Sequence, residues 1–327
     1  MSKPKVFITR AIPEKGFEML KDFCEVDVWP DDLPPGRDEL IQHVRGVDGL
    51  LCLLTDGIDG EVMDEAGPQL KVISNHAVGF DNIDVSAATA RKIPVGNTPE
   101  VLTDATADFA FALMMAAGRR ILEAERYVRD GKWNTWGPML LLGVELKGAT
   151  LGLVGFGRIG KAMARHAAGF DMRVIYYDPR EAKPSADIKA TRVAFETLLE
   201  ESDFISLHTP LTPDTRHLID SEALSKMKPS VVLVNTSRGP VVDLDALYDA
   251  LTSKRIFAAG LDVTEPEPLP VDSPLLRLDN VLIMPHIASA SKTARGEMSW
   301  MAAKNLIAGL RGERLPNCVN PRVYTRK

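Results

Sequence analysis

The sequence has little of what marks disulfide-rich, metal-binding or membrane-spanning proteins. Its three cysteines are scattered over 327 residues, too few for a disulfide framework or a zinc site. The longest apolar run, Phe109 to Ala117, is far shorter than the roughly 18 residues that span a bilayer. No apolar signal core precedes the first strand-like segment. We therefore expect no metal site and no membrane contact, and we expect a cytoplasmic protein.

Neither sign of charge dominates, and aromatic residues are scarce at 6%. The formal net charge of −6 argues against binding nucleic acid mainly by electrostatic attraction. Charged residues (26%) are mixed with hydrophobic residues (45%), a balance that is typical of folded rather than disordered chains. At roughly 150 residues per domain, the chain is long enough for about two domains.

Short apolar runs alternate with helical patterns along the whole chain. We expect strands over residues 5–9, 26–29, 49–53, 71–74, 94–95, 150–154, 173–177, 204–207, 231–235, 258–262 and 281–284. We expect helices over residues 13–23, 100–120, 161–169 and 291–310. The strand runs are continuously apolar, which is typical of parallel strands covered on both faces. The alternation occurs twice, with a boundary near Asn97-Thr98-Pro99, and so predicts two doubly wound α/β domains.

A glycine-rich segment follows the strand 150–154 and opens a helix. Its residues are Gly155, Phe156, Gly157, Arg158, Ile159 and Gly160. The first glycine permits a tight turn, the second lets a pyrophosphate approach the backbone, and the third lets helix and strand pack closely. N–H groups at the helix N-terminus attract phosphate. The pattern predicts a dinucleotide site, and the alternative is a plain tight turn.

The strand after this segment ends at Asp178, close to the spacing of about 20 residues expected for a ribose-binding acid. Its carboxylate would accept hydrogen bonds from the adenosine ribose, which favours NAD(H). Arg180, which follows Pro179, would meet a 2′-phosphate, so NADP(H) stays open. Alternatively, Asp178 only caps the end of its strand.

Three side chains suited to reducing a keto acid each follow a predicted strand: Arg238, Glu267 and His286. Because the carboxyl ends of parallel strands meet at one edge of a sheet, we expect these side chains to lie together. A carboxylate beside an imidazole orients it and favours its proton-donating form. Arginine offers a bidentate fork to a substrate carboxylate. Spacing alone leaves open the alternative that they are unrelated loop residues.

Five motifs in this order resemble those of the D-isomer-specific 2-hydroxyacid dehydrogenases. They are Val78 to Asp84, Gly155 to Gly160, Asn235 to Gly239, Gly260 to Pro268, and Pro285-His286. The resemblance covers almost the whole chain, and it is greatest to the glyoxylate and hydroxypyruvate reductases. It implies that His286 protonates the carbonyl oxygen, that Glu267 pairs with His286, and that Arg238 holds the substrate.

The resemblance also implies binding residues for both ligands. For the substrate they are Leu54, Val78, Gly79, Arg238 and Trp136, with backbone at Val78 and Gly79 gripping the carboxylate. For the cofactor they are Thr103, residues 155–160, Asp178, Pro179, Arg180, His208, Thr209, Pro210, Thr215, Thr236, Ser237 and Asp262. His76, near the carboxylate grip, stands where relatives often carry another residue, and a packing role is the simpler interpretation.

The architecture implied by the resemblance is a Rossmann nucleotide domain over residues 100–287 and a discontinuous, flavodoxin-like substrate domain over residues 1–99 and 288–327. A homodimer is expected through an arm at about residues 119–149. Trp136 in this arm either reaches the neighbouring subunit's substrate pocket or only packs in the dimer. Closure of the two domains would exclude water from the reaction.

We predict NAD(P)H-dependent reduction of a small 2-keto acid, with glyoxylate or hydroxypyruvate favoured and other D-2-hydroxy acids left open. The alternative is a binding protein that senses dinucleotide, like the corepressors that resemble this family. Against that alternative, the chain lacks the terminal tails and peptide-docking additions expected of a scaffold.

Overall fold

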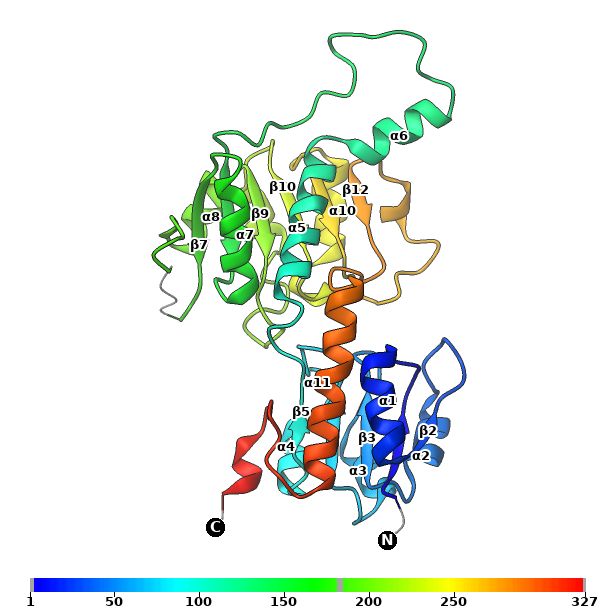
Figure 1. Cartoon of the computed structure of the whole chain (residues 1–327). Helices are drawn as coiled ribbons and strands as arrows, with labels where there is room; N and C mark the ends of the chain where they lie inside the picture. The colour runs from blue at the N-terminus through cyan, green and yellow to red at the C-terminus, as the bar shows by residue number, and fades with distance from the viewer. Residues whose placement is uncertain (1–2, 181–184, 326–327) are drawn as a thin grey trace. The chain divides into compact units, whose positions relative to one another are not determined.

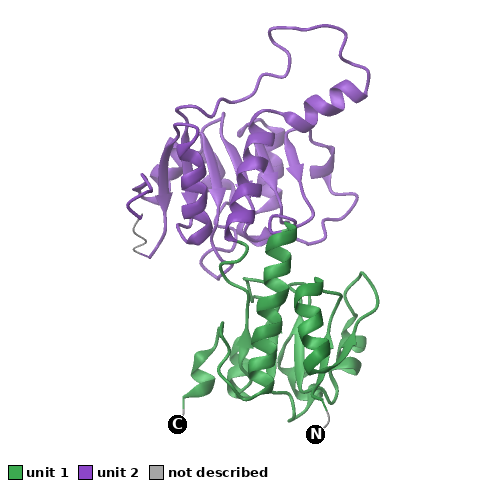
Figure 2. Ribbon diagram, viewed as in Figure 1, with its two compact units in different colours: residues 1–102, 290–327 green, residues 103–289 purple. Residues whose placement is uncertain are grey.

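The computed structural model describes residues 3–180 and 185–325 (Figure 1). The chain divides into two compact units, shown in different colours in Figure 2. Unit 1 consists of residues 1–102 and 290–327, and unit 2 consists of residues 103–289. Both cuts fall a few residues after the predicted positions at 99/100 and 287/288.

Unit 1 is built on a parallel sheet with the strand order β2-β1-β3-β4-β5. Its strands are β1 (Lys5–Ile8), β2 (Glu25–Val28), β3 (Gly49–Cys52), β4 (Val72–Asn75) and β5 (Val95–Gly96). In the register, Val6 of β1 lies opposite Val26 of β2 and Gly49 of β3. This is the flavodoxin-like order. The strands are parallel, but β2 is added on one side of β1 and β3 to β5 are added on the other.

Helices cover both faces of this sheet. Those of unit 1 are α1 (Glu14–Phe23), α2 (Arg37–Val44), α3 (Gly60–Ala66), α4 (Val85–Ala90) and α11 (Lys292–Leu310), followed by the 3₁₀ turn η3 (Pro321–Tyr324). Leu20 of α1 and Leu306 of α11 are buried in the core on one face, and Val44 of α2 and Met63 of α3 in the core on the other. Because α11 follows unit 2 in the chain, unit 1 is discontinuous, as predicted.

Unit 2 contains a parallel sheet with the order β12-β11-β10-β9-β6-β7-β8. Its strands are β6 (Thr150–Val154), β7 (Arg173–Tyr177), β8 (Thr191–Arg192), β9 (Phe204–Leu207), β10 (Val232–Asn235), β11 (Ala258–Leu261) and β12 (Val281–Ile283). The first strand of the unit, β6, lies between β7 and β9, so the order reverses there. This is the Rossmann arrangement extended by one strand, and ligands bind at such a reversal in doubly wound folds.

The sheet of unit 2 also has helices on both faces. Its helical elements are α5 (Thr103–Gly118), α6 (Ile121–Arg129), α7 (Arg158–Ala168), α8 (Phe195–Glu201), α9 (Ser221–Lys226), α10 (Leu244–Thr252), η1 (Gly239–Val241) and η2 (Pro274–Arg277). Met114 of α5 and Met163 of α7 belong to the core on one face. Leu198 of α8 and Leu247 of α10 belong to the core on the other. The two doubly wound α/β folds that the sequence predicted are therefore confirmed.

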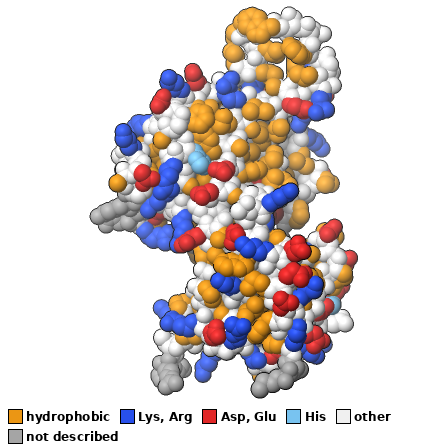
Figure 3. Space-filling model, in the orientation of Figure 1, with side chains coloured by type: hydrophobic (Ala, Val, Ile, Leu, Met, Phe, Trp, Pro, Cys, Tyr) orange, Lys and Arg blue, Asp and Glu red, His pale blue; other side chains and the backbone are white. Residues whose placement is uncertain are grey.

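An arm over residues 119–149 carries α6 and a long segment without strands. Large apolar side chains are exposed along it: Ile121, Leu122, Val128, Trp133, Trp136, Met139, Leu140 and Leu142. Figure 3 shows hydrophobic side chains gathered on this part of unit 2. Such a concentration of exposed apolar surface is unusual for a surface that stays in water.

The elements differ from the predictions mainly at their ends. The helix predicted from residue 100 begins at Thr103, because Glu100 has a left-handed φ of 74°. The helix predicted from residue 161 begins at Arg158, directly after the glycine turn. The edge strand β8 has two exposed residues and no apolar run, so the hydrophobic pattern could not reveal it. No helix of the described part is both long and apolar enough to cross a membrane.

Candidate active site

Three strands of unit 2 lead to the predicted catalytic side chains. Arg238 comes after β10, Glu267 after β11 and His286 after β12, and these strands are neighbours in the parallel sheet. Backbone at this edge is held in place, since the N–H of His286 donates to the carbonyl of Asp262 over 2.9 Å. The alternation of strands and helices that produces the parallel sheet therefore also places the three side chains at one edge of it.

His286 and Glu267 form a direct pair. Nδ1 of His286 lies 2.5 Å from Oε1 of Glu267, and both side chains are partly exposed. Burial pushes the pKa of the Glu267 carboxyl upward, but the hydrogen bond and charge of His286 outweigh it, so the pKa lies below its ordinary value. The carboxylate therefore stays charged at neutral pH. With Nδ1 engaged, Nε2 is the nitrogen of His286 left for a substrate.

Arg238 belongs to the same cluster. Its positive charge contributes to lowering the pKa of Glu267. The side chain of Asn235 shapes the turn, donating from Nδ2 to the carbonyl of Arg238 (2.8 Å) and accepting from the N–H of Ser237 (3.0 Å). Next to it, a Cβ at Gly239 would lie 1.8 Å from the carbonyl oxygen of Thr264. Only glycine allows the Arg238 loop to approach the Glu267 loop this closely.

Asp262 positions the chain that follows His286. Its two carboxylate oxygens accept from the N–H groups of Ile287 (2.8 Å) and Ala288 (2.7 Å). Burial raises the pKa of this carboxyl, although the two N–H donors work in the opposite direction. The sequence placed Asp262 near the nicotinamide and did not reveal this backbone role, because no pattern links a strand end to a loop 25 residues later.

The glycine-rich segment forms a cradle between β6 and α7. Gly155 has a left-handed φ of 92°, and a Cβ there would lie 2.6 Å from the carbonyl oxygen of His208. A Cβ at Gly160 would lie 2.3 Å from the carbonyl oxygen of Gly155. A Cβ at Gly157, in contrast, would meet nothing within 4 Å among the described residues. The turn and the packing thus need glycine at both ends, while the middle is open to a ligand.

Asp178 is buried at the end of β7 and holds the cradle. Oδ2 accepts from the N–H of Phe156 and Oδ1 from the N–H of Arg180, each over 2.9 Å. The strand-end cap that the sequence offered as an alternative for Asp178 is therefore present, and its oxygens keep further lone pairs for a ribose. The side chain of Arg180, which follows Pro179, is 82% exposed.

Further predicted cofactor residues lie in the same unit. Thr103 is the first residue of α5. In the loop after β9, Thr215 Oγ1 donates to the carbonyl of Pro210 over 2.7 Å. His208, which begins this loop before Thr209, is buried, and burial lowers its pKa to about 3.

Buried polar atoms without a partner point to a ligand at this edge. Thr236 Oγ1 and His208 Nδ1 find no hydrogen-bond partner in residues 3–180 and 185–325. Buried polar groups are rarely left this way in folded proteins unless a ligand or water satisfies them. Together with the cradle, they fit a bound dinucleotide. In the same described ranges, no group of His, Cys, Asp or Glu side chains is arranged to hold a metal ion.

The substrate residues predicted in unit 1 follow β3 and β4. Leu54 comes after β3, and Val78 and Gly79 after β4. His76, directly after β4, is buried, and burial with the nearby charge of Arg295 lowers its pKa to about 4. Trp136 belongs to the arm of unit 2, and its side chain is 78% exposed.

Comparisons with known proteins place this chain in a family. The sequence model described as "D-isomer specific 2-hydroxyacid dehydrogenase, NAD binding domain" matches residues 111–288. A glyoxylate reductase of Korarchaeum cryptofilum is 54% identical over 323 residues, which cover 98% of this chain and 97% of the relative. The chain belongs to this family.

Solved structures agree with the dehydrogenase fold. A crystal structure of a protein from Thermus thermophilus has a TM-score of 0.91 and 47% identity, covering 96% of this chain and 99% of that one. An NADPH-dependent glyoxylate/hydroxypyruvate reductase of Sinorhizobium meliloti, in complex with NADP and malonate, has a TM-score of 0.85 and 33% identity, covering 100% and 99%. The protein is therefore an NAD(P)-dependent oxidoreductase of 2-hydroxy and 2-keto acids, and the alternative of a dinucleotide-sensing binding protein is not favoured.

Sequence reasoning missed several polar contacts of this dehydrogenase. Glu265, two residues before Glu267, pairs with Arg216 and with His217 Nε2 (3.2 Å), which ties two loops of unit 2 together. In unit 1, Arg10 pairs with the buried Asp56. Charged residues far apart in the chain carry no shared pattern, so only the fold reveals such pairs.

Proposed function

We propose that this dehydrogenase reduces glyoxylate or hydroxypyruvate to the corresponding 2-hydroxy acid. The observation that carries the proposal is the His286–Glu267 pair beside Arg238, at the same sheet edge as a dinucleotide cradle. The names of the relatives support these substrates, since the glyoxylate reductase of K. cryptofilum is 54% identical.

The roles of the three side chains follow from their chemistry. When bound, the reduced nicotinamide supplies a hydride to the carbonyl carbon. His286 donates the Nε2 proton to the carbonyl oxygen and keeps Nδ1–H on Glu267, whose charge favours the imidazolium before the transfer. Arg238 binds the substrate carboxylate as a fork and fixes the carbonyl for reaction.

Backbone in unit 1 is proposed to bind the same carboxylate. Carbonyl oxygens on both residues of the turn are held by side chains: Asn97 Nδ2 donates to Val78 (2.8 Å), and Asn75 Nδ2 donates to Gly79 (2.9 Å). These two bonds fix the turn that carries the N–H groups of Val78 and Gly79. Adjacent backbone N–H groups in a fixed turn suit a carboxylate.

NAD(H) is the proposed cofactor, because the Asp178 carboxylate would repel a 2′-phosphate and can accept from ribose hydroxyls. NADP(H) has support of its own in the exposed Arg180 and in the NADP complex of the S. meliloti enzyme. Residues 155–160, Thr215, Thr236 and Ser237 would line the remainder of the cofactor site.

A homodimer through the arm is the proposed assembly. The exposed side chains of the arm, Trp133 and Trp136 among them, form the apolar surface that a partner would cover. Trp136 is proposed to pack in this interface or to reach the partner's substrate. The cytoplasmic location remains a prediction of the sequence.

The direct test is a kcat/KM panel of 2-keto acids with NADH and with NADPH. We expect the highest values for glyoxylate or hydroxypyruvate, with NADH preferred. Purified protein that oxidises neither cofactor with any 2-keto acid would refute the proposed function. A preference for a bulky 2-keto acid would refute only the substrate assignment.

A further inference from the structure

Two loops at one edge of the unit 1 sheet carry the predicted substrate residues. The first follows β3 and contains Leu54. The second follows β4 and contains Val78 and Gly79. In the sequence the two loops are separated by α3 and β4, so their spacing depends on the contacts that the fold makes between them.

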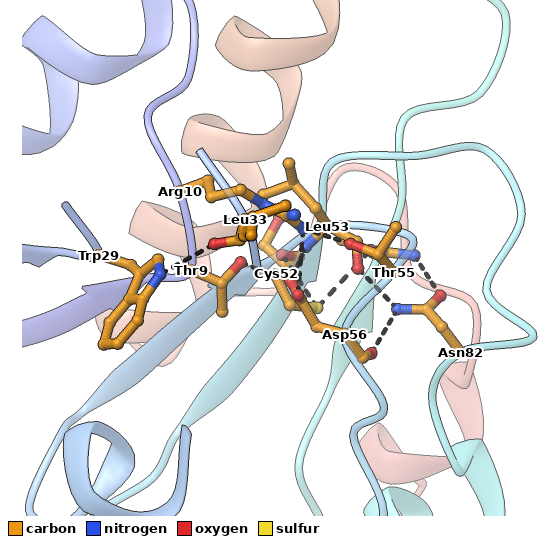
Figure 4. Close-up of polar contacts among 11 residues, drawn as sticks. Thr9, Arg10, Trp29, Leu33, Cys52, Leu53, Thr55, Asp56 and Asn82 are labelled. Carbon is orange, nitrogen blue, oxygen red and sulfur yellow. Dashed lines mark hydrogen bonds and ion pairs between the residues drawn. The ribbon is translucent and has the colours of Figure 1, made fainter. Parts of the chain in front are cut away.

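A single asparagine side chain connects the two loops (Figure 4). Nδ2 of Asn82 donates to the carbonyl of Leu53 over 3.0 Å and to the carbonyl of Asp56 over 3.1 Å. Its Oδ1 accepts from Nδ2 of Asn75 over 3.0 Å. The same Nδ2 of Asn75 donates to the carbonyl of Gly79 over 2.9 Å. Asn82 therefore bridges the ends of the first loop to the turn of the second.

The first loop is also held from its other side, by the buried carboxylate of Asp56. Oδ2 accepts from Thr9 Oγ1 over 2.5 Å and from the N–H of Leu53 over 2.7 Å. Oδ1 accepts from Arg10 Nη2 over 3.1 Å, and Arg10 also contacts Thr55. Beyond Asp56, the backbone of Ile58 pairs with the second loop, its N–H donating to the carbonyl of Asn82 (2.9 Å) and its carbonyl accepting from the N–H of Asp84 (2.8 Å). The Asn82 side chain is the contact that ties the Leu53–Asp56 part of the first loop, which contains Leu54, to the turn of Val78 and Gly79.

Resting on the function proposed above, we infer that Asn82 is a positioning residue that sets the spacing between these two substrate loops and thereby selects small 2-keto acids. The N–H groups of Val78 and Gly79 would bind the carboxylate of any 2-keto acid. Leu54 would then limit the size of the group on the other side of the keto carbon. When the bridge is lost, the two loops can move apart. Binding of the smallest 2-keto acid then weakens, and larger 2-keto acids are no longer excluded.

The test compares kcat/KM for glyoxylate and for 2-ketobutyrate in two variants. Asn82→Ala removes the whole bridge. Asn82→Asp keeps its size and the acceptor for Asn75 but cannot donate to the carbonyls of Leu53 and Asp56. We expect KM for glyoxylate to rise and the glyoxylate preference to fall on the order of tenfold in both variants, since both lose the two hydrogen bonds to the carbonyls of Leu53 and Asp56. Saturating kcat and NADH affinity should stay within about threefold, because the acid–base pair and the cradle keep their contacts.

Asn320→Ala is the matched control in the same unit. Asn320 Nδ2 donates to Thr89 Oγ1 (3.1 Å) and the carbonyl of Ile93 (2.9 Å), and its Oδ1 accepts from the N–H of Val95 (2.8 Å). Oδ1 of Asn320 also accepts from Cys318 Sγ (3.4 Å), so its side chain makes at least as many bonds as that of Asn82, but these bonds lie where β5 begins, at the opposite edge of the sheet. We expect this variant to keep the glyoxylate preference of the wild type.

Three outcomes would overturn the inference. The first is an unchanged substrate preference in both Asn82 variants. The second is an equal change in Asn320→Ala, and the third is failure of both Asn82 variants to fold with wild-type NADH affinity. Inactivity of the wild type on every 2-keto acid is a different result, which refutes the proposed function itself.

Discussion

The carboxyl edges of the two sheets carry histidines in contrasting environments. In unit 1, His76 directly follows β4 and is buried, with a pKa of about 4. In unit 2, His208 directly follows β9 and is likewise buried, with a pKa of about 3. His286 stands after β12, is partly exposed and pairs with Glu267 over 2.5 Å. Residues at the ends of parallel strands are thus two buried, neutral imidazoles and one imidazole that is paired with a carboxylate and equipped to donate a proton.

A second contrast concerns what each edge offers a ligand. The edge of unit 2 presents charged side chains: Arg238, Glu267 and His286. In unit 1 the proposed substrate contacts are backbone N–H groups, those of Val78 and Gly79, and the carbonyls of these residues are held by asparagine side chains. A residue at the carboxyl end of a parallel strand lies where a ligand can reach it. The groups that contact this residue then determine whether it takes part in the reaction, binds the substrate or only packs in the fold.

The largest effect is expected from His286→Ala, which removes the proposed proton donor. We predict a fall in kcat of about 10²–10⁴-fold with glyoxylate, in line with the usual contribution of a general acid. NADH affinity, measured by fluorescence titration, should be retained, because the cradle is untouched. A variant with wild-type kcat would end the assignment of His286 as the proton donor.

Glu267→Gln should have the next largest effect. The amide can still accept a hydrogen bond from Nδ1 of His286 but has no charge to favour the imidazolium. We predict a fall in kcat/KM for glyoxylate of about tenfold at neutral pH, with NADH affinity retained. A variant with wild-type kcat/KM would mean that Glu267 does not act through His286.

Arg180→Ala should affect one cofactor only. Because its exposed guanidinium would meet a 2′-phosphate, we predict a several-fold loss of kcat/KM with NADPH and little change with NADH. The cofactor ratio of the purified variant measures this directly. Equal losses with both cofactors would place Arg180 outside the 2′-phosphate site.

The last expected effect concerns stability rather than turnover and is the pH dependence caused by the two buried histidines. Because the pKa values of His76 (about 4) and His208 (about 3) lie below the unfolded value of about 6.5, the unfolded chain binds more protons in this window. The free energy of unfolding should therefore fall as pH drops from about 6.5 towards 4, by at most about 1.4 kcal/mol per pH unit and histidine.

Denaturant unfolding at pH 7, 6 and 5 measures this dependence. His76→Gln and His208→Gln should each flatten the curve relative to the wild type, since glutamine does not titrate. The surface residue His43, paired with Asp27, provides a control as His43→Gln. A wild-type slope in either buried variant would contradict the neutral state assigned to that histidine.

The fold and the three catalytic candidates could be predicted because each leaves a local pattern. Apolar runs marked most of the strands, although β2 alternates and β8 has no apolar run, and each catalytic candidate lies in the loop that follows one of the marked strands. The spacing of the glycines at 155, 157 and 160 is itself the pattern that predicts a dinucleotide site.

The network around Asn82 and Asp56 could not be predicted, since its partners come from the segment after β1, from the loop after β3 and from the end of β4. Only the strand order brings those segments together. Every residue has a backbone carbonyl group, so the sequence does not show which carbonyls accept hydrogen bonds from these side chains. For the same reason, the sequence interpretation of Asp178 emphasised the ribose and underrated its bonds to the cradle.

The most direct test of the central claim is the configuration of the product formed from hydroxypyruvate. Purified protein would be incubated with hydroxypyruvate and NADH, and the glycerate would be resolved by chiral chromatography while NADH consumption is followed by absorbance. The account predicts D-glycerate in an amount equal to the NADH consumed. L-glycerate, a racemic mixture, or no consumption of NADH with either hydroxypyruvate or glyoxylate would contradict it.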